Sequence, residues 1–507
     1  MKLTRRQAFA LAGTLAGTSF ADLACTEARP RPRLLPSRLA IPEPFQTELP
    51  VPRVLKPART DGAADYYEMA ARPASAEPIA GVRTNIWGYD GTFPGPTIEA
   101  RSGRAALLTL RNSLPVPIVN HLHGGRTESL SDGYPTDFVL PGTGERFTGG
   151  NPQRSVSGVR EYRYENRQRA AQLWYHDHRM DFSGAQVWRG LAGIYLLRDE
   201  EEDRLPLPRG AKEIPLVICD RSFEADGSLA YPSIDSTLRG APGVTHAYMG
   251  GVLGDVILVN GAAWPRVSVS NTRYRFRVLN ASNARRYDLA LDPAPAQGPA
   301  FVQIGSDGGL LGSPIRHRTV RIAPAERFDL IVDFSAYPVG TAVTLRNLSD
   351  SGKTGAILRF QIDRKEKDDS AIPERLSSFE PVDIRNIAKT REFDFRFDRT
   401  SHIWTINGRP FDEARIDADP RLDSTEIWRL RSDFNHPLHL HLVHFQVLSH
   451  GGPPGRWDAG WKDTIDMEPG QATSIAMRFS GYRGKYVFHC HNLEHEDMAM
   501  MANMEVV

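Results

Sequence analysis

The chain has 507 residues, of which 40% are hydrophobic and 24% are charged, a composition typical of a globular protein with several domains. Lys and Arg number 62 against 61 Asp and Glu, which gives a formal net charge of +1. Since no long basic tract is present either, nucleic acid is not an expected partner.

The first 28 residues are predicted to be an export signal. Arg5 and Arg6 precede a short stretch rich in Ala and Gly, which carries no charge from Ala8 to Ala21. This stretch is too short to span a bilayer, and the pattern is typical of a twin-arginine signal cleaved after Ala21. We therefore expect export to the periplasm or the extracellular space. A chance arginine pair and a lipid anchor at Cys25 are the alternatives.

Residues 29–58 contain eight prolines and are predicted to form an extended arm without helices. Beyond this arm, short runs of alternating apolar and polar residues, such as "RYRFRVL" and "KYVFHC", are separated by turn residues. Long stretches with helical periodicity are scarce. This pattern predicts an all-β protein made of sandwiches or barrels.

A loose internal repeat divides the chain. Segments 90–113, 260–282 and 407–433 each combine an Asx-Gly turn, a nearby aromatic residue or proline, and a strand of alternating residues. Three copies predict three related β-domains. We place these domains at 59–200, 201–362 and 391–507. The charged and polar segment 363–390 is predicted to be the linker before the third domain.

Ten of the 15 histidines fall in four short clusters. The clusters are "HLHG" (His121, His123), "WYHDH" (His176, His178), "HPLHLH" (His436, His439, His441) and "HCHNLEH" (His489, His491, His495). The first two clusters lie in the first repeat and the last two in the third, whereas the middle repeat has only His246 and His317. Scattered surface histidines would not be concentrated in this way. We therefore predict metal ligands where the first and third domains meet.

Strand geometry explains the spacing of these clusters. Side chains at positions i and i+2 of a strand point to the same face, so each His-x-His pair aims two imidazoles together. In "HCH", His489 and His491 face one side and Cys490 faces the other. Cys490 can therefore bind one metal ion while its neighbours bind others.

The ligand types indicate which metal is bound. A cysteine thiolate with two imidazoles and a weak methionine is the ligand set of a blue-copper centre. Cys490, His495 and Met500 supply three such ligands from one loop, and a distant histidine can complete the set. Zinc also accepts cysteine and histidine, but a zinc site gives no reason for eight further histidines. Cys219, in the apolar run "IPLVICD", is predicted to be a buried small residue.

The four clusters resemble those of the multicopper oxidases, and the resemblance covers nearly the whole chain after the signal. The motifs "HPLHLHLVHFQVL", "SDGYP", "IWGYDGTFPGPTIE", "IGSDGGLL" and "APAERFDLIVDF" are similar to those of the bacterial laccase branch. Bilirubin oxidases and phenoxazinone synthases are close relations of that branch. The resemblance implies an all-β fold of three consecutive cupredoxin-like Greek-key β-sandwich domains, matching the three repeats.

The resemblance also implies four copper ions with assigned ligands. The mononuclear type 1 copper would be held by His436, Cys490, His495 and, axially, Met500. In a trinuclear cluster, the single type 2 copper would take His121 and His439. The two type 3 coppers would take His123, His176, His178, His441, His489 and His491.

Two carboxylates match acids to which the family gives a proton-supplying role. They are Asp132 in "SDGYP" and Glu496, which directly follows a ligand, while Cys490 would carry electrons between the two sites. The alternative for Asp132 is a turn-stabilising residue before Gly133, and the alternative for Glu496 is a solvated charge.

The activity implied by the resemblance is that of a laccase. Such an oxidase couples the one-electron oxidation of phenolic, aromatic or bilirubin-like reductants to the four-electron reduction of O₂ to water. Two alternatives are a metallo-oxidase acting on Cu(I), Mn(II) or Fe(II), and a blue-copper electron carrier without turnover. The carrier would not need the eight trinuclear histidines. We expect a monomer without a transmembrane segment, whose partners are a small-molecule reductant and O₂.

Overall fold

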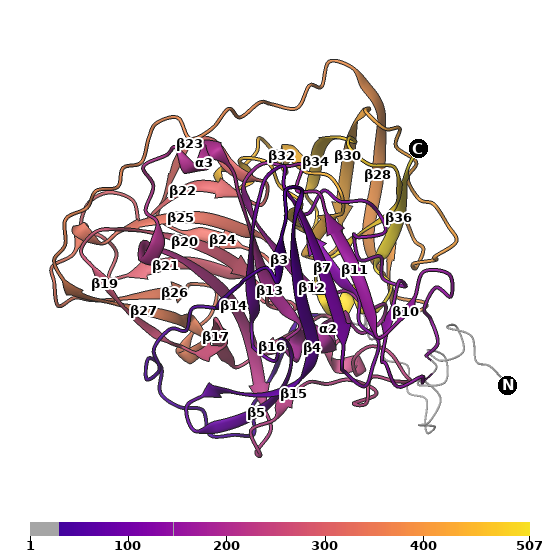
Figure 1. Cartoon of the computed structure of the whole chain (residues 1–507), viewed down its shortest axis with the longest axis horizontal. Helices are drawn as coiled ribbons and strands as arrows, with labels where there is room; N and C mark the ends of the chain where they lie inside the picture. The colour runs from indigo at the N-terminus through magenta and orange to yellow at the C-terminus, as the bar shows by residue number, and fades with distance from the viewer. Residues whose placement is uncertain (1–29, 146) are drawn as a thin grey trace, which may run out of the picture.

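The computed structural model describes residues 30–145 and 147–507 of the chain (Figure 1). In this part of the chain most of the regular structure is strand, and the strands form three consecutive two-sheet sandwiches. The predicted all-β class with three sandwich domains is therefore confirmed. The predicted export signal lies outside the described residues.

The first sandwich joins a sheet of order β11-β7-β4-β3, with β5 also paired to β4, to a sheet of order β2-β6-β13-β12-β8. The strand bounds are β2 Val54–Leu55, β3 Arg59–Thr60, β4 Ala64–Ile79, β5 Val82–Tyr89, β6 Gly95–Arg101, β7 Ala105–Asn112, β8 Asn120–His123, β11 Val159–Tyr164, β12 Ala171–Asp177 and β13 Ala192–Arg198. The short strands β9 (Val139–Leu140) and β10 (Val156–Ser157) pair with each other. Helices α2 (Ser183–Trp188) and α3 (Glu200–Asp203) follow β12 and β13.

The middle sandwich has one sheet of order β18-β17-β14-β20-β25-β22-β23, with β15 paired to β14, and a second of order β19-β27-β26-β21-β24. The strand bounds are β14 Glu213–Phe223, β15 Leu229–Ala230, β17 Val256–Val259, β18 Ala262–Ala263, β19 Arg266–Ser270, β20 Arg273–Asn280, β21 Tyr287–Asp292, β22 Phe301–Ser306, β23 Gly309–His317, β24 Val320–Ile322, β25 Arg327–Asp333, β26 Ala342–Asn347 and β27 Ala356–Arg364. Four 3-10 helices lie in its loops: η1 (Gly210–Lys212), η2 (His246–Tyr248), η3 (Phe334–Ala336) and η4 (Gly352–Gly355).

The third sandwich pairs a sheet of order β29-β28-β30-β34-β32 with a sheet of order β33-β31-β35-β36. The strand bounds are β28 Ile387–Asp398, β29 Ile403–Ile406, β30 Thr425–Ser432, β31 His436–Leu440, β32 Phe445–His450, β33 Thr464–Met467, β34 Ala472–Arg478, β35 Gly484–Cys490 and β36 Met501–Val506. The 3-10 helix η5 (Arg456–Asp458) precedes β33, and helix α4 (Leu493–Asp497) connects β35 to β36.

Two irregular segments connect the sandwiches. In the proline-rich arm, β1 (Arg33–Leu35) pairs in parallel with β16 (Val252–Gly254) of the middle region, while β2 adds a strand to the first sandwich. Residues 365–386 form no strand and pass over the outside of the molecule between β27 and β28 (Figure 1).

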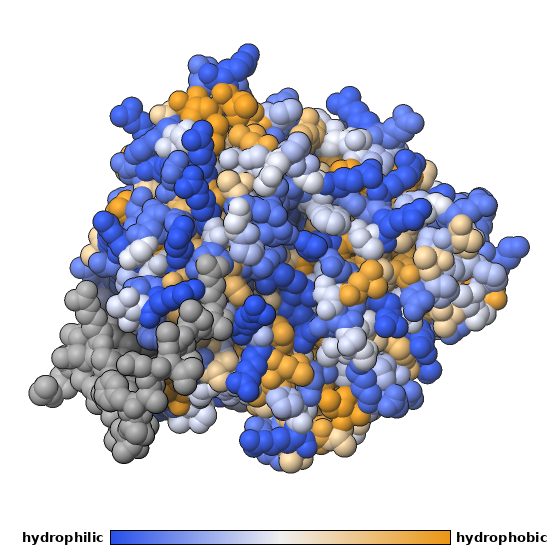
Figure 2. All heavy atoms as spheres, turned by 180° about the vertical axis from the view of Figure 1, so that it is seen from behind, coloured by the Kyte–Doolittle hydropathy of each residue, from blue (hydrophilic) through white to orange (hydrophobic). Residues whose placement is uncertain are grey.

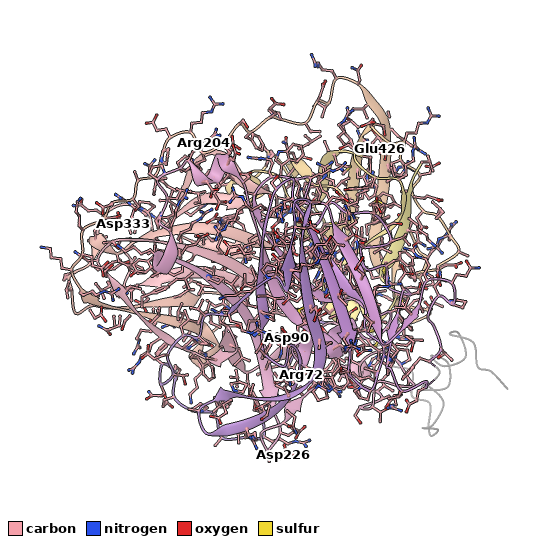
Figure 3. All side chains as sticks on the ribbon, in the orientation of Figure 1. Arg72, Asp90, Arg204, Asp226, Asp333 and Glu426 are labelled. Carbon is pink, nitrogen blue, oxygen red and sulfur yellow. The ribbon has the colours of Figure 1, made fainter. Side chains whose placement is uncertain are left out.

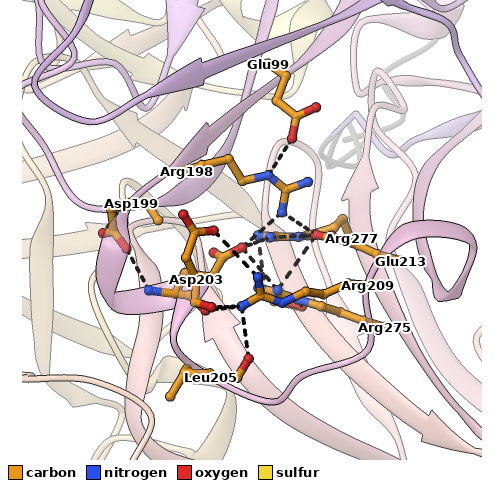
Figure 4. A network of polar contacts seen from close by, with 12 residues as sticks. Glu99, Arg198, Asp199, Asp203, Leu205, Arg209, Glu213, Arg275 and Arg277 are labelled. Atoms are coloured by element: carbon orange, nitrogen blue, oxygen red, sulfur yellow. Dashed lines mark hydrogen bonds and ion pairs between the residues drawn. The ribbon is translucent and has the colours of Figure 1, made fainter. Parts of the chain in front are cut away.

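Strand β20 shows how alternation is used on both faces of the middle sheet. Tyr274, Phe276 and Val278 pack in the hydrophobic core. Arg275 and Arg277 point the other way, yet they are only 1% and 2% exposed. Their guanidinium groups form ion pairs with Asp329 of β25, with Glu202 of α3 and with Glu213 of β14, in the network of Figure 4. This paired charge layer ties the first sandwich to the middle one, because unpaired buried charges would be strongly unfavourable.

Many charged side chains lie at the periphery of the molecule, as the labelled Arg204 and Asp226 do in Figure 3. The face shown in Figure 2 is mostly hydrophilic, with several separate hydrophobic patches. Among the described residues, no helix has the length and apolar character needed to cross a membrane.

Candidate metal centre

Two antiparallel strand pairs carry the paired histidines, one in the first sandwich and one in the third. Strands β8 and β12 place His121 opposite His176, and strands β31 and β35 place His439 opposite His489. The two pairs meet across the domain boundary. The Nε2 atoms of His121 and His439 lie 3.3 Å apart, and those of His178 and His489 lie 3.2 Å apart. The structure thus brings these histidines together where the first and third sandwiches touch.

All eight histidines assigned to the trinuclear cluster are at most 1% exposed. They are His121, His123, His176, His178, His439, His441, His489 and His491. Three groups have ligand atoms within 4.8 Å of one another: His121 with His439 and His441, His121 with His123 and His176, and His178 with His441 and His489. The ring centroid of His491 lies 5.0 Å from that of His123 and 5.2 Å from that of His176.

The hydrogen bonds of these rings leave nitrogen lone pairs free to bind metal. Nδ1 of His121, His176, His439 and His489 each donates to a backbone carbonyl, at 2.5–3.1 Å. A carbonyl can only accept, so Nδ1 carries the proton and Nε2 keeps its lone pair. Burial also lowers the pKa of His121 and His439, and that of His176 to about 3, so these three rings are neutral. Buried, neutral imidazoles with converging lone pairs fit metal ions.

Unpartnered nitrogens point to the same conclusion. His176 Nε2, His123 Nδ1 and both ring nitrogens of His491 are buried without a hydrogen-bond partner among the described residues. Buried polar groups are normally hydrogen-bonded, so orphaned nitrogens at one place indicate a ligand that they bind.

A second group lies in the third sandwich alone. Nδ1 of His436 is 3.3 Å from Sγ of Cys490 and 3.1 Å from Nδ1 of His495, and the Cys490 Sγ to His495 Nδ1 distance is 3.6 Å. All three side chains are fully buried. Burial raises the pKa of the Cys490 thiol, so a bound cation is needed to keep it as a thiolate.

The backbone places Met500 at this second group. Its carbonyl accepts from the Cys490 amide at 3.1 Å, and its amide donates to the His495 carbonyl at 3.0 Å. Met500 packs in the same hydrophobic cluster as Cys490, whereas Met501 packs in a different cluster with Tyr134. These backbone and packing contacts therefore favour Met500 over Met501 as the axial donor.

Strand β35 connects the two groups. His489 and His491 flank Cys490 in sequence, and their rings lie among the eight histidines while the Cys490 sulfur lies with His436 and His495. The strand alternation predicted from "HCH" is present. A single residue and its two peptide bonds thus join the two candidate metal sites.

Asp132 contacts two of the histidines. Its carboxylate Oδ2 accepts from His441 Nδ1 at 2.7 Å, and its backbone carbonyl accepts from His121 Nδ1. Burial raises the pKa of this carboxyl well above its ordinary value. The turn beside it is also tight, since Gly133 has a φ of +84° and a Cβ there would lie 2.4 Å from the Asn120 carbonyl oxygen. Asp132 therefore both lies in a tight turn and orients ligand rings.

Glu496 lies on the opposite side of the cluster. Its two oxygens are 3.1 Å from His178 Nδ1 and 3.2 Å from His489 Nδ1. Burial alone would raise its pKa, but the two neighbouring imidazoles lower it to about 2. Glu496 is 2% exposed, so the alternative of a solvated charge is wrong.

Comparison with known proteins decides the family. Two family models, both described as multicopper oxidase, match residues 70–202 and 385–507. These ranges contain all four histidine clusters. The chain belongs to the multicopper oxidase family. It is therefore an oxidoreductase that uses O₂ as acceptor, and its metal is copper rather than zinc.

Relatives of this multicopper oxidase include enzymes with named activities. The laccase of Bacillus subtilis is 36% identical, over 92% of this chain and 98% of the relative. The bilirubin oxidase of Albifimbria verrucaria is 33% identical, over 90% of this chain and 80% of the relative. The crystal structure of a laccase from Pediococcus acidilactici superposes with a TM-score of 0.79 at 31% identity, covering 93% of this chain and 95% of that one.

One functional residue of this multicopper oxidase was not identified from its sequence. Asp463, directly before β33, accepts from His123 Nε2 at 3.0 Å, and its backbone carbonyl accepts from His439 Nδ1 at 3.0 Å. The bond to Nε2 leaves Nδ1 of His123 as the metal-binding nitrogen. No histidine lies next to Asp463 in sequence. Nothing beyond the run "GWKDT", in which it stands, could therefore have pointed to its contact with metal ligands.

The middle sandwich holds Asp463 in place. Arg327 Nη1 donates to Asp463 Oδ1 at 2.7 Å, and Arg327 Nε donates to the carbonyl of Gln172 in the first sandwich at 3.1 Å. Arg327 and Asp463 are both 1% exposed. The middle sandwich contributes no candidate metal ligand. Its Arg327 contacts both flanking sandwiches, however, and thereby holds Asp463, which orients the ligand His123.

Arg327→Met should therefore destabilise the protein. Asp463 would become a buried charge without its partner, which costs about 3–5 kcal/mol. Urea unfolding of the copper-free variant and wild type measures this loss. Arg204→Met is the matched control, because Arg204 forms an exposed pair with Glu200 and should change stability by less than about 1 kcal/mol. Equal stability of the two variants would show that Arg327 does not hold the domains together.

The remaining histidines lie apart from both groups. His444 Nε2 donates to the Gly124 carbonyl at 3.0 Å, as expected for a packed, hydrogen-bonded histidine. His450 contacts Asp458, and His317 contacts Gln303. The ring centroids of His246 and His402 are 6.0 Å apart near the surface.

Proposed function

We propose that this multicopper oxidase is a laccase-type enzyme with four copper ions in two sites. The mononuclear type 1 ion would be held by His436, Cys490, His495 and Met500. The type 2 ion would be held by His121 and His439. The type 3 pair would be held by His123, His176 and His491 on one side and by His178, His441 and His489 on the other. The proposal rests on one observation. Cys490 joins two buried groups of side chains, and each group has the ligand types that its copper site requires.

Copper held by these residues would supply the redox chemistry, in which four single-electron oxidations of the reductant are coupled to the reduction of O₂ with four protons to two waters. Cys490 and its peptide bonds to His489 and His491 provide the shortest covalent connection between the two ligand groups. The protein keeps that connection dry, since all three side chains are at most 1% exposed.

Trp404 covers the type 1 side of the site. Its indole ring stacks on His495 with centroids 3.8 Å apart, and its Nε1 donates to the Met249 carbonyl at 2.9 Å. Phe434 lies 5.9 Å from the His495 ring. This aromatic cover excludes water from the imidazole through which we expect the reductant's electrons to enter.

Asp132 and Glu496 serve the cluster in two ways. Asp132 accepts from His441 through its carboxylate and from His121 through its backbone carbonyl, and the Glu496 carboxylate lies beside His178 and His489, so each residue fixes two ligand rings. Each also lies where it can pass protons to the cluster, and the reduction of O₂ consumes protons.

Similarity to a laccase and a bilirubin oxidase supports phenolic, aromatic or bilirubin-like reductants. The alternative is a metallo-oxidase acting on Cu(I), Mn(II) or Fe(II). A non-catalytic carrier would not need the second ligand group. We further propose export of the enzyme by the twin-arginine route to the periplasm or beyond, without a lipid anchor at Cys25, and action as a monomer.

Oxygen consumption by the copper-loaded enzyme tests the substrate class. Phenols and bilirubin should sustain O₂ uptake, whereas Mn(II), Fe(II) and Cu(I) should add little above their uncatalysed oxidation. A higher rate with one of the metal ions than with every phenol would favour the metallo-oxidase. If none of the reductants sustained O₂ uptake, only the electron-carrier alternative would remain.

A further inference from the structure

A cavity outside the metal centre lies between the middle and third sandwiches. It has a volume of about 590 Å³, within the range typical of small-molecule sites. Its walls include Arg316, Arg318 and Thr319 at the end of β23 and Arg456 and Trp457 of η5. None of its lining residues belongs to either candidate copper site.

Three of the residues that line this cavity are exposed arginines without a carboxylate partner. Among the described residues, no acid forms an ion pair with Arg316, Arg318 or Arg456. The nearby Asp458 is already engaged, because its oxygens lie 3.2 Å and 3.3 Å from His450 Nδ1 and one accepts from the Gly455 amide at 2.7 Å. By contrast, Arg321 on the next strand pairs with Asp288 and Glu468.

The charge of Arg456 acts on His317, another residue of the cavity wall. His317 lies between Arg316 and Arg318 in sequence and also lines the cavity; its side chain is buried, and its Nε2 contacts Gln303. Burial, and after it the charge of Arg456, lowers the pKa of His317 to about 4. His317 is therefore neutral at pH 7, and the positive charge of the cavity comes from the arginines.

Trp457 supplies a fixed aromatic surface. Its indole Nε1 donates to the Thr319 carbonyl at 3.2 Å, so the ring is anchored across the domain boundary. The guanidinium carbon of Arg321 lies 5.6 Å from the ring centroid, which restrains the ring further. A restrained half-buried aromatic ring beside unpaired guanidinium groups can take a planar ligand with little loss of side-chain entropy.

We propose that this cavity is a binding site for an aromatic carboxylate. Guanidinium groups bind carboxylates through paired, charge-assisted hydrogen bonds, and the indole provides a face for the ligand's ring. The three arginines supply more positive charge than one carboxylate neutralises, which favours anions over neutral aromatics. The site is independent of the copper ligands, so the proposal stands or falls separately from the oxidase activity.

Equilibrium dialysis of 2-naphthoate against the copper-loaded protein tests this site. The probe joins a carboxylate to a two-ring aromatic and has no phenol to be oxidised. We expect saturable binding, with the neutral 2-naphthamide binding at least about tenfold more weakly. The double variant Arg316→Gln/Arg456→Gln and the single variant Trp457→Leu should each weaken 2-naphthoate binding about tenfold.

Arg399→Gln is the matched control, because Arg399 is exposed, has no ion-pair partner among the described residues and lies outside the cavity. It should bind 2-naphthoate as the wild type does. No saturable binding, or equal binding by the wild type and the double variant, would overturn the proposal. Displacement of 2-naphthoate by an equal concentration of inorganic phosphate would overturn the assignment of an aromatic ligand.

Discussion

Cys490→Ser should abolish both the blue colour of the copper-loaded protein and its oxidase turnover. The intense blue absorption requires a copper–thiolate bond, and within residues 30–145 and 147–507 Cys490 is the only cysteine near the type 1 ligands. Serine has nearly the same shape but does not supply a thiolate. The eight histidines of the other site are unchanged, so that site should still bind copper.

Cys219→Ser is the control for this variant. Cys219 is also a buried free cysteine, but it lies in β14 of the middle sandwich. Its replacement buries a hydroxyl and should cost stability by about 1–3 kcal/mol without changing colour. Visible spectra and O₂ uptake of the two variants distinguish these outcomes. A Cys490→Ser protein that stayed blue would refute the whole type 1 assignment.

Asp132→Asn and Glu496→Gln should each leave copper content and colour nearly intact while lowering turnover by about 10²–10⁴-fold, the usual contribution of a positioned acid or base. The amides keep the size of the side chain, but they do not hold and release a proton. Copper analysis and steady-state O₂ uptake in air-saturated buffer measure the two effects. Wild-type turnover in both variants would show that neither carboxyl supplies protons.

Asp137→Asn is the matched control for these carboxyl variants. Asp137 is also buried, in the same segment as Asp132, but it pairs with Arg154 rather than with an imidazole. Its replacement should affect stability more than turnover. Loss of copper from Asp132→Asn would instead indicate that the turn before Gly133, and not proton supply, is the main role of Asp132.

Local periodicity explains why the ligand groups could be predicted from the sequence. The alternation of His489, Cys490 and His491 on one strand fixes which side chains share a face, whatever the rest of the fold does. The two end repeats carry the clusters and the middle one does not, which already places the site at the contact of the first and third domains. The axial Met500 could be chosen only through the family resemblance.

Contacts between distant residues explain what the sequence could not predict. Arg327 and Asp463 are 136 residues apart, and nothing near either residue signals that they meet. Arg275 and Arg277 occupy strand positions that normally face solvent, yet the packing of two sandwiches buries them. The arginine-lined cavity likewise depends on how η5 approaches β23. No local sequence pattern predicts that approach.

The metal content of the purified enzyme tests the central claim most directly. Elemental analysis combined with electron paramagnetic resonance should find four coppers per chain. One should give the signal of a blue centre and one that of a type 2 centre, while the coupled type 3 pair stays silent. One blue copper per chain, with no metal at the eight histidines, would contradict the account and leave an electron carrier, and stoichiometric zinc would contradict it entirely.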